Sequence, residues 1–212
     1  MDHPNGLGRL ADRLRALPAS CGPVRLVAVD GHAGSGKSTF AARLADALGG
    51  APVLHLDDIA SHERLFAWTD RLAAQVTGPL SRGERALYTP YDWELRAFGP
   101  PRPLDPAPVV LLEGVGAGRG ELRPSLAALL WMELGPAASW ARGRARDGAA
   151  QSGFWDGWTV AESRHFARDP SRPHADFLVR QLREGYEVTP VTPVTASPNH
   201  TVTHGDGHAP PY

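Results

Sequence analysis

The eight residues from Gly31 to Ser38 constrain the fold of this chain more than any other segment. They read Gly-His-Ala-Gly-Ser-Gly-Lys-Ser and fit the pattern G-x-x-x-x-G-K-[ST] at every fixed position. A β-branched apolar run at 24–29 precedes them, and Phe40 and Leu44 follow at helical spacing. A strand, a glycine-rich loop and a helix in this order predict a P-loop, whose backbone N–H groups surround phosphate. The alternative, a chance glycine-rich turn, does not account for this context.

Lys37 supports the same interpretation. It is the only lysine among 22 basic residues, and the other 21 are arginines. A lysine places a compact charge on β- and γ-phosphates, where an arginine would force a planar fork into a tight loop. Ser38 adds a hydroxyl suited to Mg²⁺. The predicted nucleotide-binding residues are Gly31, His32, Ala33, Gly34, Ser35, Gly36, Lys37, Ser38 and Thr39.

Composition narrows the class of protein. The 212 residues carry 42% hydrophobic residues and a net charge of −1, which gives no electrostatic reason to expect a nucleic-acid or membrane partner. The single cysteine, Cys21, fits a reducing compartment. No apolar run reaches the roughly 18 residues of a membrane span, and the first residues lack the pattern of a signal peptide. We therefore expect a cytoplasmic protein that binds small molecules, of undetermined oligomeric state.

Apolar runs that alternate with helical patterns predict an α/β fold of the P-loop NTPase type, with three layers, a five-stranded parallel sheet and a helical lid. Strands are expected at 24–29, 53–56, 108–112, 130–134 and 175–179. Helices are expected at 7–17, 39–48, 62–76 (with Ser61 as N-cap), 122–130, 137–150 and 158–168. The predicted P-loop domain is 1–188, with a lid at about 137–155 and an irregular, substrate-binding insertion at about 78–107.

Three acidic residues follow predicted strands. Asp57 and Asp58 come after the second strand, where a carboxylate could accept the proton of a hydroxyl group. The alternative for Asp58 is a helix cap. Glu113 ends the third strand, in the place of a carboxylate that binds Mg²⁺ through water; the alternative is an exposed charge at a strand end. Metal binding is therefore assigned to Ser38 and Glu113.

Arg142, Arg144 and Arg146 lie close together in the predicted lid. They could neutralise charge on a transferred phosphoryl group, or they could be a solvated helix face. In the insertion, Tyr91 and Trp93 could stack on a flat base or could belong to the core. Asp92 could hold ribose hydroxyls there. The aromatic residues Trp155, Trp158 and Phe166 are expected to pack within the fold.

The segment 189–212 is rich in Pro, Thr and Ser and is predicted to be disordered. His200, His204 and His208 are spaced by four within it, as metal ligands on a helix would be. Nearby Gly and Pro residues argue against a helix, so we interpret these histidines as part of a solvated tail.

Taken together, the motifs resemble the uridine kinase family, in the wider group that includes phosphoribulokinases and nicotinamide riboside kinases. The matching segments are 30–39, Leu56-Asp57-Asp58, Tyr91-Asp92-Trp93, Leu112-Glu113-Gly114, 142–147 and 175–179. The resemblance implies ATP and Mg²⁺ as cofactors, Asp57 as general base, Glu113 as the metal-associated acid, Arg142 and Arg146 as lid arginines, and Tyr91 as a base-stacking residue. The catalytic residues are then Asp57, Lys37, Arg142 and Arg146, and Asp57, Tyr91, Asp92 and Arg96 contact the acceptor.

Two positions differ from the family pattern. Arg96 stands where uridine kinases commonly carry a histidine, and Gly143 interrupts the lid arginines. Arg96 would suit an acceptor with a carboxylate or phosphate, so plain uridine is expected to be a poor substrate. The expected activity is transfer of the γ-phosphate of ATP to a hydroxyl of a nucleoside-like small molecule. The alternatives are a sugar, vitamin-precursor or antibiotic kinase, and a non-catalytic ATP-binding regulator.

Overall fold

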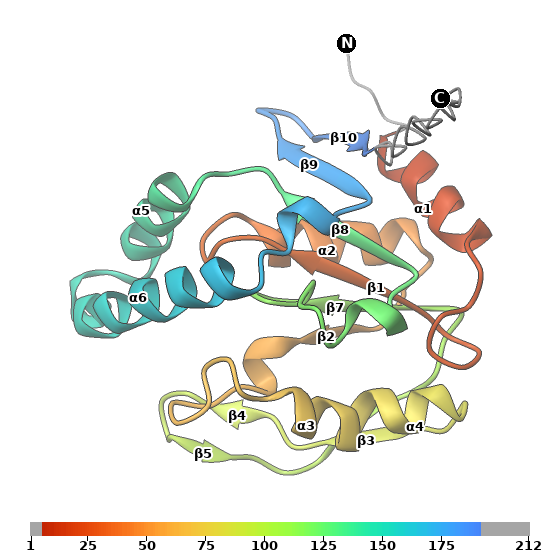
Figure 1. Ribbon diagram of the computed structural model, residues 1–212, viewed down its shortest axis with the longest axis horizontal. Coiled ribbons are helices and arrows are strands. Elements are labelled where there is room, and N and C mark those ends of the chain that lie inside the picture. Colours follow the sequence, from red (N-terminus) through yellow and green to blue (C-terminus); the bar gives the residue numbers. More distant parts are fainter. Residues whose placement is uncertain (1–5, 192–212) are drawn as a thin grey trace, which may run out of the picture.

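Strands and helices alternate along the chain and form the three-layer α/β fold that the sequence predicts (Figure 1). The computed structural model describes residues 6–191. The strands of the central sheet are β1 (Arg25–Asp30), β2 (Val53–His55), β7 (Val109–Glu113), β8 (Ala128–Met132), β9 (Phe177–Gln181) and β10 (Tyr186–Pro190). None of the described helices is both long enough and apolar enough to pass through a membrane.

The sheet has the order β10-β9-β8-β1-β7-β2. Five of its strands are parallel, as predicted, and β10 adds an antiparallel edge strand next to β9. Thr189 and Pro190, which were assigned to the disordered tail, belong to β10 and pair with Leu178 and Phe177. Val191, which follows β10, donates its N–H to the Asp176 carbonyl at 2.8 Å. The rest of that predicted tail, 192–212, includes the three histidines and lies outside the described residues.

Alternate residues of the buried strands face opposite layers. Val27 and Val29 of β1 face the layer formed by α1 (Gly6–Ala16) and α2 (Lys37–Ala47). Leu26 and Ala28 face the opposite layer, which α3 (Thr69–Leu72) and α4 (Gly78–Ser81) help to form. Phe40 of α2 and Leu72 of α3 are fully buried against these two faces, and burial of such a side chain contributes about 1.5–3 kcal/mol. The sheet edge beside the P-loop is thereby held between two packed layers.

The helix expected at 62–76 is predicted with the wrong first and last residues. The segment 62–68 is a loop: Ser61 Oγ accepts a hydrogen bond from the Arg64 N–H at 3.2 Å, and Trp68 Nε1 donates to the Leu65 carbonyl at 3.1 Å. These local bonds satisfy the backbone without a helix. Helical structure begins at Thr69 and runs through a π-helical turn, Ala73–Thr77, into α4. The wider turn precedes Pro79, which has no N–H to donate.

The helix expected at 122–130 is also wrong. A short 3₁₀ turn, Arg123–Ser125, is followed by β8, which lies between β1 and β9 with all five of its residues buried. A fully buried strand shows no alternation of polar and apolar residues, so its apolar run resembles that of a buried helix. The strand expected at 130–134 is accordingly displaced to Ala128–Met132.

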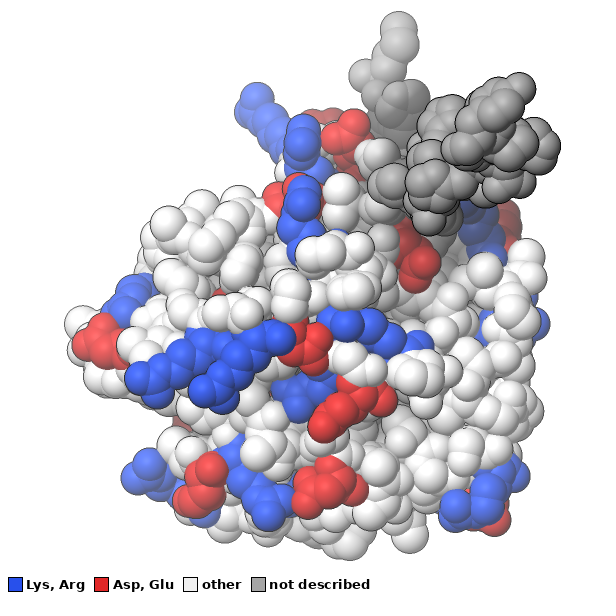
Figure 2. Space-filling model, viewed as in Figure 1, with Lys and Arg blue, Asp and Glu red and all other residues white. Residues whose placement is uncertain are grey.

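The insertion contains two small hairpins, β3 (Ala86–Tyr88) with β6 (Arg102–Leu104) and β4 (Tyr91–Asp92) with β5 (Ala97–Phe98). The expected lid comprises α5 (Pro136–Asp147), a 3₁₀ turn at Ala149–Gln151 and the first residues of α6 (Ser152–Arg168). Figure 1 shows α5 and α6 together at one end of the sheet and the insertion below it. On the face seen in Figure 2, basic and acidic side chains are interspersed, in agreement with the net charge of −1.

Gly143 explains how closely α5 and α6 pack. A Cβ atom at this position would lie 2.2 Å from Trp155 of α6. We expect Gly143→Ala to lower the free energy of unfolding by about 1–3 kcal/mol, because the overpacking outweighs the better helix propensity of alanine. Urea unfolding measures the change.

The matched control is Gly157→Ala in α6, where a Cβ would meet nothing within 4 Å. This variant is expected to be more stable than the wild type by about 0.5–1 kcal/mol. Equal stability of the two variants would contradict the tight contact between α5 and α6.

Candidate active site

The loop from Gly31 to Gly36 connects β1 to α2 and has the conformation of a phosphate-binding loop. Gly34 and Gly36 have φ angles of 84° and 96°, which glycine adopts without strain. A Cβ on Gly34 would lie 2.1 Å from the Ser139 carbonyl of α5, so only glycine lets α5 approach the loop. Lys37 begins α2, and its Nζ donates to the His32 carbonyl at 3.0 Å. The ammonium group therefore points into the ring of the loop, where it would meet an anion.

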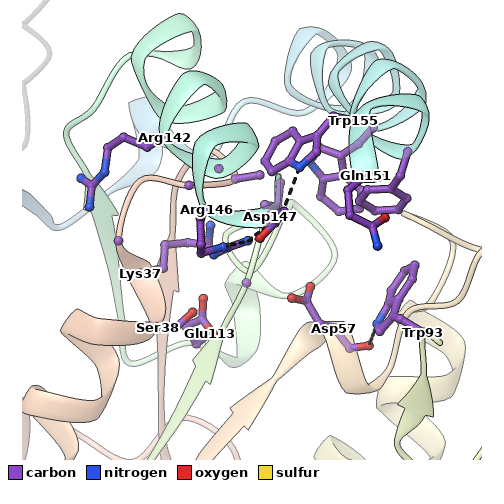
Figure 3. Close-up of a pocket in the computed structure, with 18 of the residues that line it drawn as sticks. Lys37, Ser38, Asp57, Trp93, Glu113, Arg142, Arg146, Asp147, Gln151 and Trp155 are labelled. Atoms are coloured by element: carbon purple, nitrogen blue, oxygen red, sulfur yellow. Dashed lines mark hydrogen bonds and ion pairs between the residues drawn. The ribbon is translucent and has the colours of Figure 1, made fainter. Parts of the chain in front are cut away.

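Two carboxylates face the same cavity as Lys37. Glu113 ends β7, and Asp57 lies in the 3₁₀ turn Leu56–Asp58 directly after β2. Because β2 and β7 are parallel neighbours, both acids reach the same edge of the sheet. Figure 3 shows Asp57 pointing into the cavity between Glu113 and Trp93, whose Nε1 donates to the Asp57 carbonyl oxygen at 3.0 Å.

Glu113 is buried, with 5% of its surface exposed, which excludes the exposed strand-end alternative. Its Oε2 lies 2.6 Å from Nδ1 of His55, the residue opposite it on β2. The hydrogen bond to Glu113 raises the pKa of His55 and outweighs the opposing effect of burial. The pair holds the Glu113 carboxylate in one orientation at the base of the cavity.

The Asp57 side chain is exposed and lines the cavity. Desolvation and the nearby charge of Glu113 raise its pKa, and Lys37 opposes them. Asp58 points elsewhere: its Oδ2 accepts a hydrogen bond from the Tyr88 hydroxyl at 3.4 Å. Of the two adjacent acids, only Asp57 lines the cavity.

The lid arginines differ in their surroundings. Arg142 and Arg146 line the cavity. Arg142 donates to the Gln181 side chain at 3.1 Å, and Arg146 is paired with its neighbour Asp147 at 2.6 Å. Arg144 instead pairs with Asp156 at 2.8 Å, on the lid surface. Two of the three arginines therefore lie where they could contact a phosphate group.

The cavity has a volume of about 610 Å³ and extends from the P-loop past Asp57 to an aromatic end. At that end, Trp93 of the insertion contacts His62 and Phe154, with ring centroids 4.9 Å and 5.9 Å apart. Phe154 in turn stacks on Trp158 at 5.8 Å. The insertion and α6 together thus form a wall of aromatic rings facing the catalytic carboxylate candidate.

The other residues assigned to the acceptor lie outside the cavity lining. Tyr91 is buried, and its hydroxyl lies 2.9 Å from His62 Nδ1. Asp92 accepts hydrogen bonds from the N–H groups of Glu94 and Leu95 and shapes the β4–β5 turn. Arg96 is an exposed turn residue with a φ of 53°. Tyr91 thus supports the wall through His62 and Trp93, while Asp92 and Arg96 shape and end the turn.

Sequence reasoning missed several residues that line this cavity. They are His62, Glu94, Asp147, Gln151 and Phe154, while Trp155 and Trp158 were expected only to pack. Asp147 ends the matching segment 142–147 but was given no role there. The other residues belong to no local motif, because the cavity arises where the insertion meets the lid. Glu162, buried behind the P-loop, was also missed. Its one local signal is the spacing of four from Trp158, whose Nε1 donates to it at 2.7 Å.

Ser38 and Glu113 offer oxygen ligands of the kind that Mg²⁺ prefers, and both line the cavity beside Lys37. Within the described part of the chain, no group of three or more His, Cys, Asp or Glu side chains could hold a metal by itself. A site with two protein oxygens fits Mg²⁺, which usually keeps several waters and takes further ligands from phosphate groups.

Comparisons with known proteins rest on structure. No protein-family model matches the chain, and no curated protein matches it in sequence. A protein from Bacillus stearothermophilus, described as a "possible uridine kinase", is similar in structure with a TM-score of 0.62 and 18% identity, over 84% of this chain and 99% of that one. A protein from Silicibacter sp. TM1040, described as a candidate fructose transport system kinase, has a TM-score of 0.51 and 23% identity, over 78% and 89%.

The chain shares the fold of these two proteins, both of which are described as kinases. This confirms the predicted fold class and agrees with the resemblance seen in the motifs. At 18% and 23% identity the likeness concerns the fold and leaves the acceptor open.

The raised pKa of Asp57 gives a prediction for stability. A carboxyl group whose pKa is higher in the folded protein binds its proton more tightly there, so stability rises as the pH falls through that pKa and the charged form is costly at neutral pH. Asp57→Asn is therefore expected to raise the melting temperature at pH 7. This gain should shrink as the pH falls toward about 4, near the ordinary pKa of aspartate.

Melting curves over a pH series measure this effect. Asp58→Asn is the matched control, since its carboxyl faces Tyr88 and not the cavity. If Asp57→Asn lowers the melting temperature at pH 7, the result contradicts the raised pKa of Asp57.

Proposed function

We propose that this chain transfers the γ-phosphate of ATP to a hydroxyl group of a small aromatic, nucleoside-like molecule. The observation that carries the proposal is the meeting of Lys37, Ser38, Glu113 and Asp57 in one cavity with an aromatic end. The P-loop, Glu113 and Asp57 supply the parts that phosphoryl transfer requires: a phosphate cradle, oxygen ligands for a metal, and an acceptor for a proton.

In this mechanism, the N–H groups of the P-loop and the Lys37 ammonium bind the β- and γ-phosphates. Ser38 and Glu113 would hold Mg²⁺, directly or through water, and the ion would supply positive charge to the phosphate oxygens. Arg142 and Arg146, on the lid side of the cavity, neutralise charge on the transferred group. Arg146 can reach a phosphate by leaving its exposed pair with Asp147, since such pairs are weak.

Asp57 orients the acceptor hydroxyl and takes its proton. The hydroxyl oxygen forms a bond to the γ-phosphorus, the bond to the β–γ bridging oxygen breaks, and ADP leaves with that electron pair. A general base works best when its pKa lies nearer the working pH. The raised pKa of Asp57 is in the direction that favours this role.

A smaller cavity supports ATP as the donor. It has a volume of about 300 Å³ and lies beside Ser35 of the P-loop, between the ends of β8 and β9. Met132, Leu134 and Val179 give it apolar walls, and Arg142 lines both cavities. A purine base could occupy this cavity beside the P-loop.

The aromatic end of the main cavity indicates the class of acceptor. Trp93, Phe154 and Trp158 offer ring faces for stacking, and Glu94 and Asp57 add negative charge. Within the described part of the chain, the insertion contributes no lysine or arginine to this lining. A neutral or cationic ring therefore fits better than the anionic acceptor expected from Arg96, which lies outside the lining.

The first test changes the proposed base. Asp57→Asn is expected to lower kcat by roughly 10²–10⁴-fold, with little change in ATP affinity, because the amide keeps the shape and loses the proton acceptor. ADP release and ATP titration measure the two quantities. Asp58→Asn is the matched control and should cost clearly less. If Asp58→Asn is the more damaging change, the assignment of the base is wrong.

The second test compares acceptors. ADP release is measured with uridine, orotidine and fructose; orotidine differs from uridine by one carboxylate, and fructose lacks a base. We expect kcat/KM for uridine to exceed that for orotidine by about tenfold or more, because like charges at a binding site are costly. Glu94→Gln should reduce the difference in kcat/KM between uridine and orotidine. Loss of ADP release in Lys37→Ala shows that the ADP comes from this site. A preference for orotidine would restore Arg96 as the acceptor-binding residue, and a preference for fructose would indicate a sugar kinase.

A further inference from the structure

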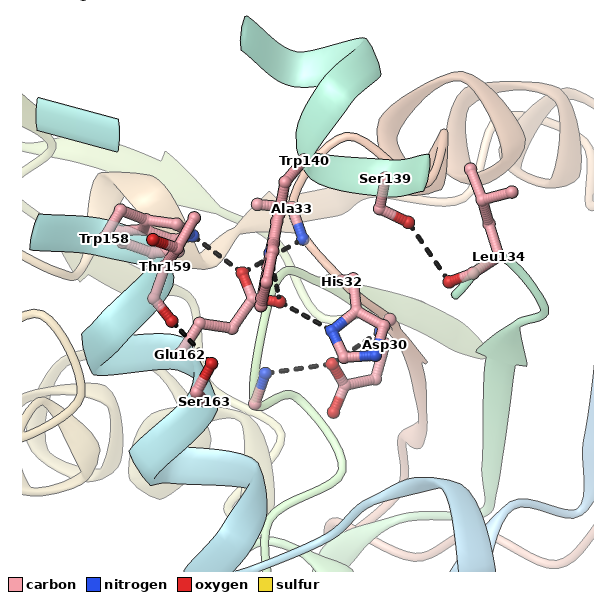
Figure 4. Close-up of polar contacts among 12 residues, drawn as sticks. Asp30, His32, Ala33, Leu134, Ser139, Trp140, Trp158, Thr159, Glu162 and Ser163 are labelled. Carbon is pink, nitrogen blue, oxygen red and sulfur yellow. Dashed lines mark hydrogen bonds and ion pairs between the residues drawn. The ribbon is translucent and has the colours of Figure 1, made fainter. Parts of the chain in front are cut away.

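The P-loop contacts a buried carboxylate that the proposed reaction does not use. Glu162 of α6 has 0% of its surface exposed. Its two oxygens accept four hydrogen bonds (Figure 4). Oε1 lies 2.6 Å from His32 Nδ1 and 3.1 Å from Trp140 Nε1. Oε2 lies 3.2 Å from the Ala33 backbone nitrogen and 2.7 Å from Trp158 Nε1.

These donors come from three parts of the fold. His32 and Ala33 belong to the P-loop, Trp140 belongs to α5, and Trp158 lies one turn before Glu162 in α6. Burial by itself would raise the pKa of Glu162, but the hydrogen bonds from His32, Trp140 and Trp158 outweigh it and lower the pKa. The carboxylate is thus charged at neutral pH, and each bond to it is stronger than one between neutral groups.

The same contacts lead to Lys37. The His32 ring is held by Glu162 and also packs edge-on against Trp131 and Phe166, with centroids 5.4 Å and 5.1 Å apart. The His32 carbonyl in turn accepts the hydrogen bond from Lys37 Nζ. A continuous series of contacts therefore runs from the buried carboxylate, through the first turn of the loop, to the phosphate-binding lysine.

We propose that Glu162 is a positioning residue that holds the P-loop and Lys37 in their phosphate-binding shape and fastens the loop to both lid helices. The part that concerns nucleotide rests on the proposed function; the part that concerns the loop does not. An ordinary packing role would predict that a variant of the same shape behaves like the wild type, whereas positioning by four hydrogen bonds requires two acceptor oxygens.

Glu162→Gln tests this distinction. Glutamine keeps the shape but replaces one carboxylate oxygen with an NH₂ group. The two N–H groups that bond to that oxygen in the wild type would then face another donor. Unsatisfied buried donors carry a large penalty. We expect hydrogen exchange of the amides in 31–38 to be faster by about tenfold or more in the protein without nucleotide, and the Kd for ATP to rise by roughly 10–100-fold. At saturating ATP, kcat should fall much less than the affinity, because Glu162 does not touch the reacting atoms.

Asp169→Asn is the matched control. Asp169 follows α6 directly and also accepts a loop N–H, that of Gly120 at 2.7 Å, together with Arg123 at 2.5 Å. It holds the segment after β7 and makes no contact with the P-loop. This variant should leave both P-loop exchange and ATP affinity within about twofold of the wild type, since only remote bonds are changed.

The outcomes separate the two proposals. If hydrogen exchange of the P-loop amides and the affinity for ATP are the same in Glu162→Gln as in the wild type, the positioning role is overturned. Faster exchange in a protein whose wild type binds no ATP would support positioning and contradict the kinase function. If Glu162→Gln does not fold, Trp140→Phe removes one donor and keeps an aromatic ring; exchange in 31–38 should then rise by a few-fold, and unchanged exchange would overturn the proposal.

Discussion

The site depends on the parallel pairing of β7 with β1 on one side and β2 on the other. In this register Val29 lies opposite Glu113, and Glu113 lies opposite His55. Parallel strands end at the same edge, so the loop after β1, the acid that ends β7 and the turn after β2 meet there. The loop after β1 and two carboxylates far apart in sequence line one cavity because the backbone hydrogen bonds of the sheet align three strands.

The lid is fastened to this edge by close contacts of small residues and by one buried charge. Gly34 lets the Ser139 carbonyl approach the P-loop, and Gly143 lets Trp155 lie against α5. Glu162 joins the loop to both lid helices from behind. These contacts place Arg142 and Arg146 over the cavity while leaving their ends exposed. The two arginines that would meet a nucleotide therefore lie on an anchored helix, and their exposed side chains bond to Gln181 and Asp147.

Residue patterns predicted most of the sheet and the core of the site, and they failed where short-range and long-range forces compete. The P-loop follows the buried strand β1, Glu113 ends the buried strand β7, and Asp57 follows the short strand β2. The helix predicted for the segment 122–130 was wrong because a strand buried on both faces has no periodicity that distinguishes it from a helix. The helix predicted for the segment 62–68 was wrong because hydrogen bonds at Ser61 and Trp68 favour a local turn. The spacing of the apolar residues alone would allow a helix there.

The sequence by itself determined the phosphate loop, the α/β class and the two acids, because each depends on backbone geometry set by neighbours along the chain. Only the tertiary structure decided which groups form the aromatic end of the cavity. Trp93, His62 and Phe154 come from three separate segments, and their rings meet because the insertion and α6 pack across the cavity. Glu162 likewise receives its partners from three elements. Contacts between distant segments follow from the packing of whole layers, which no local pattern contains.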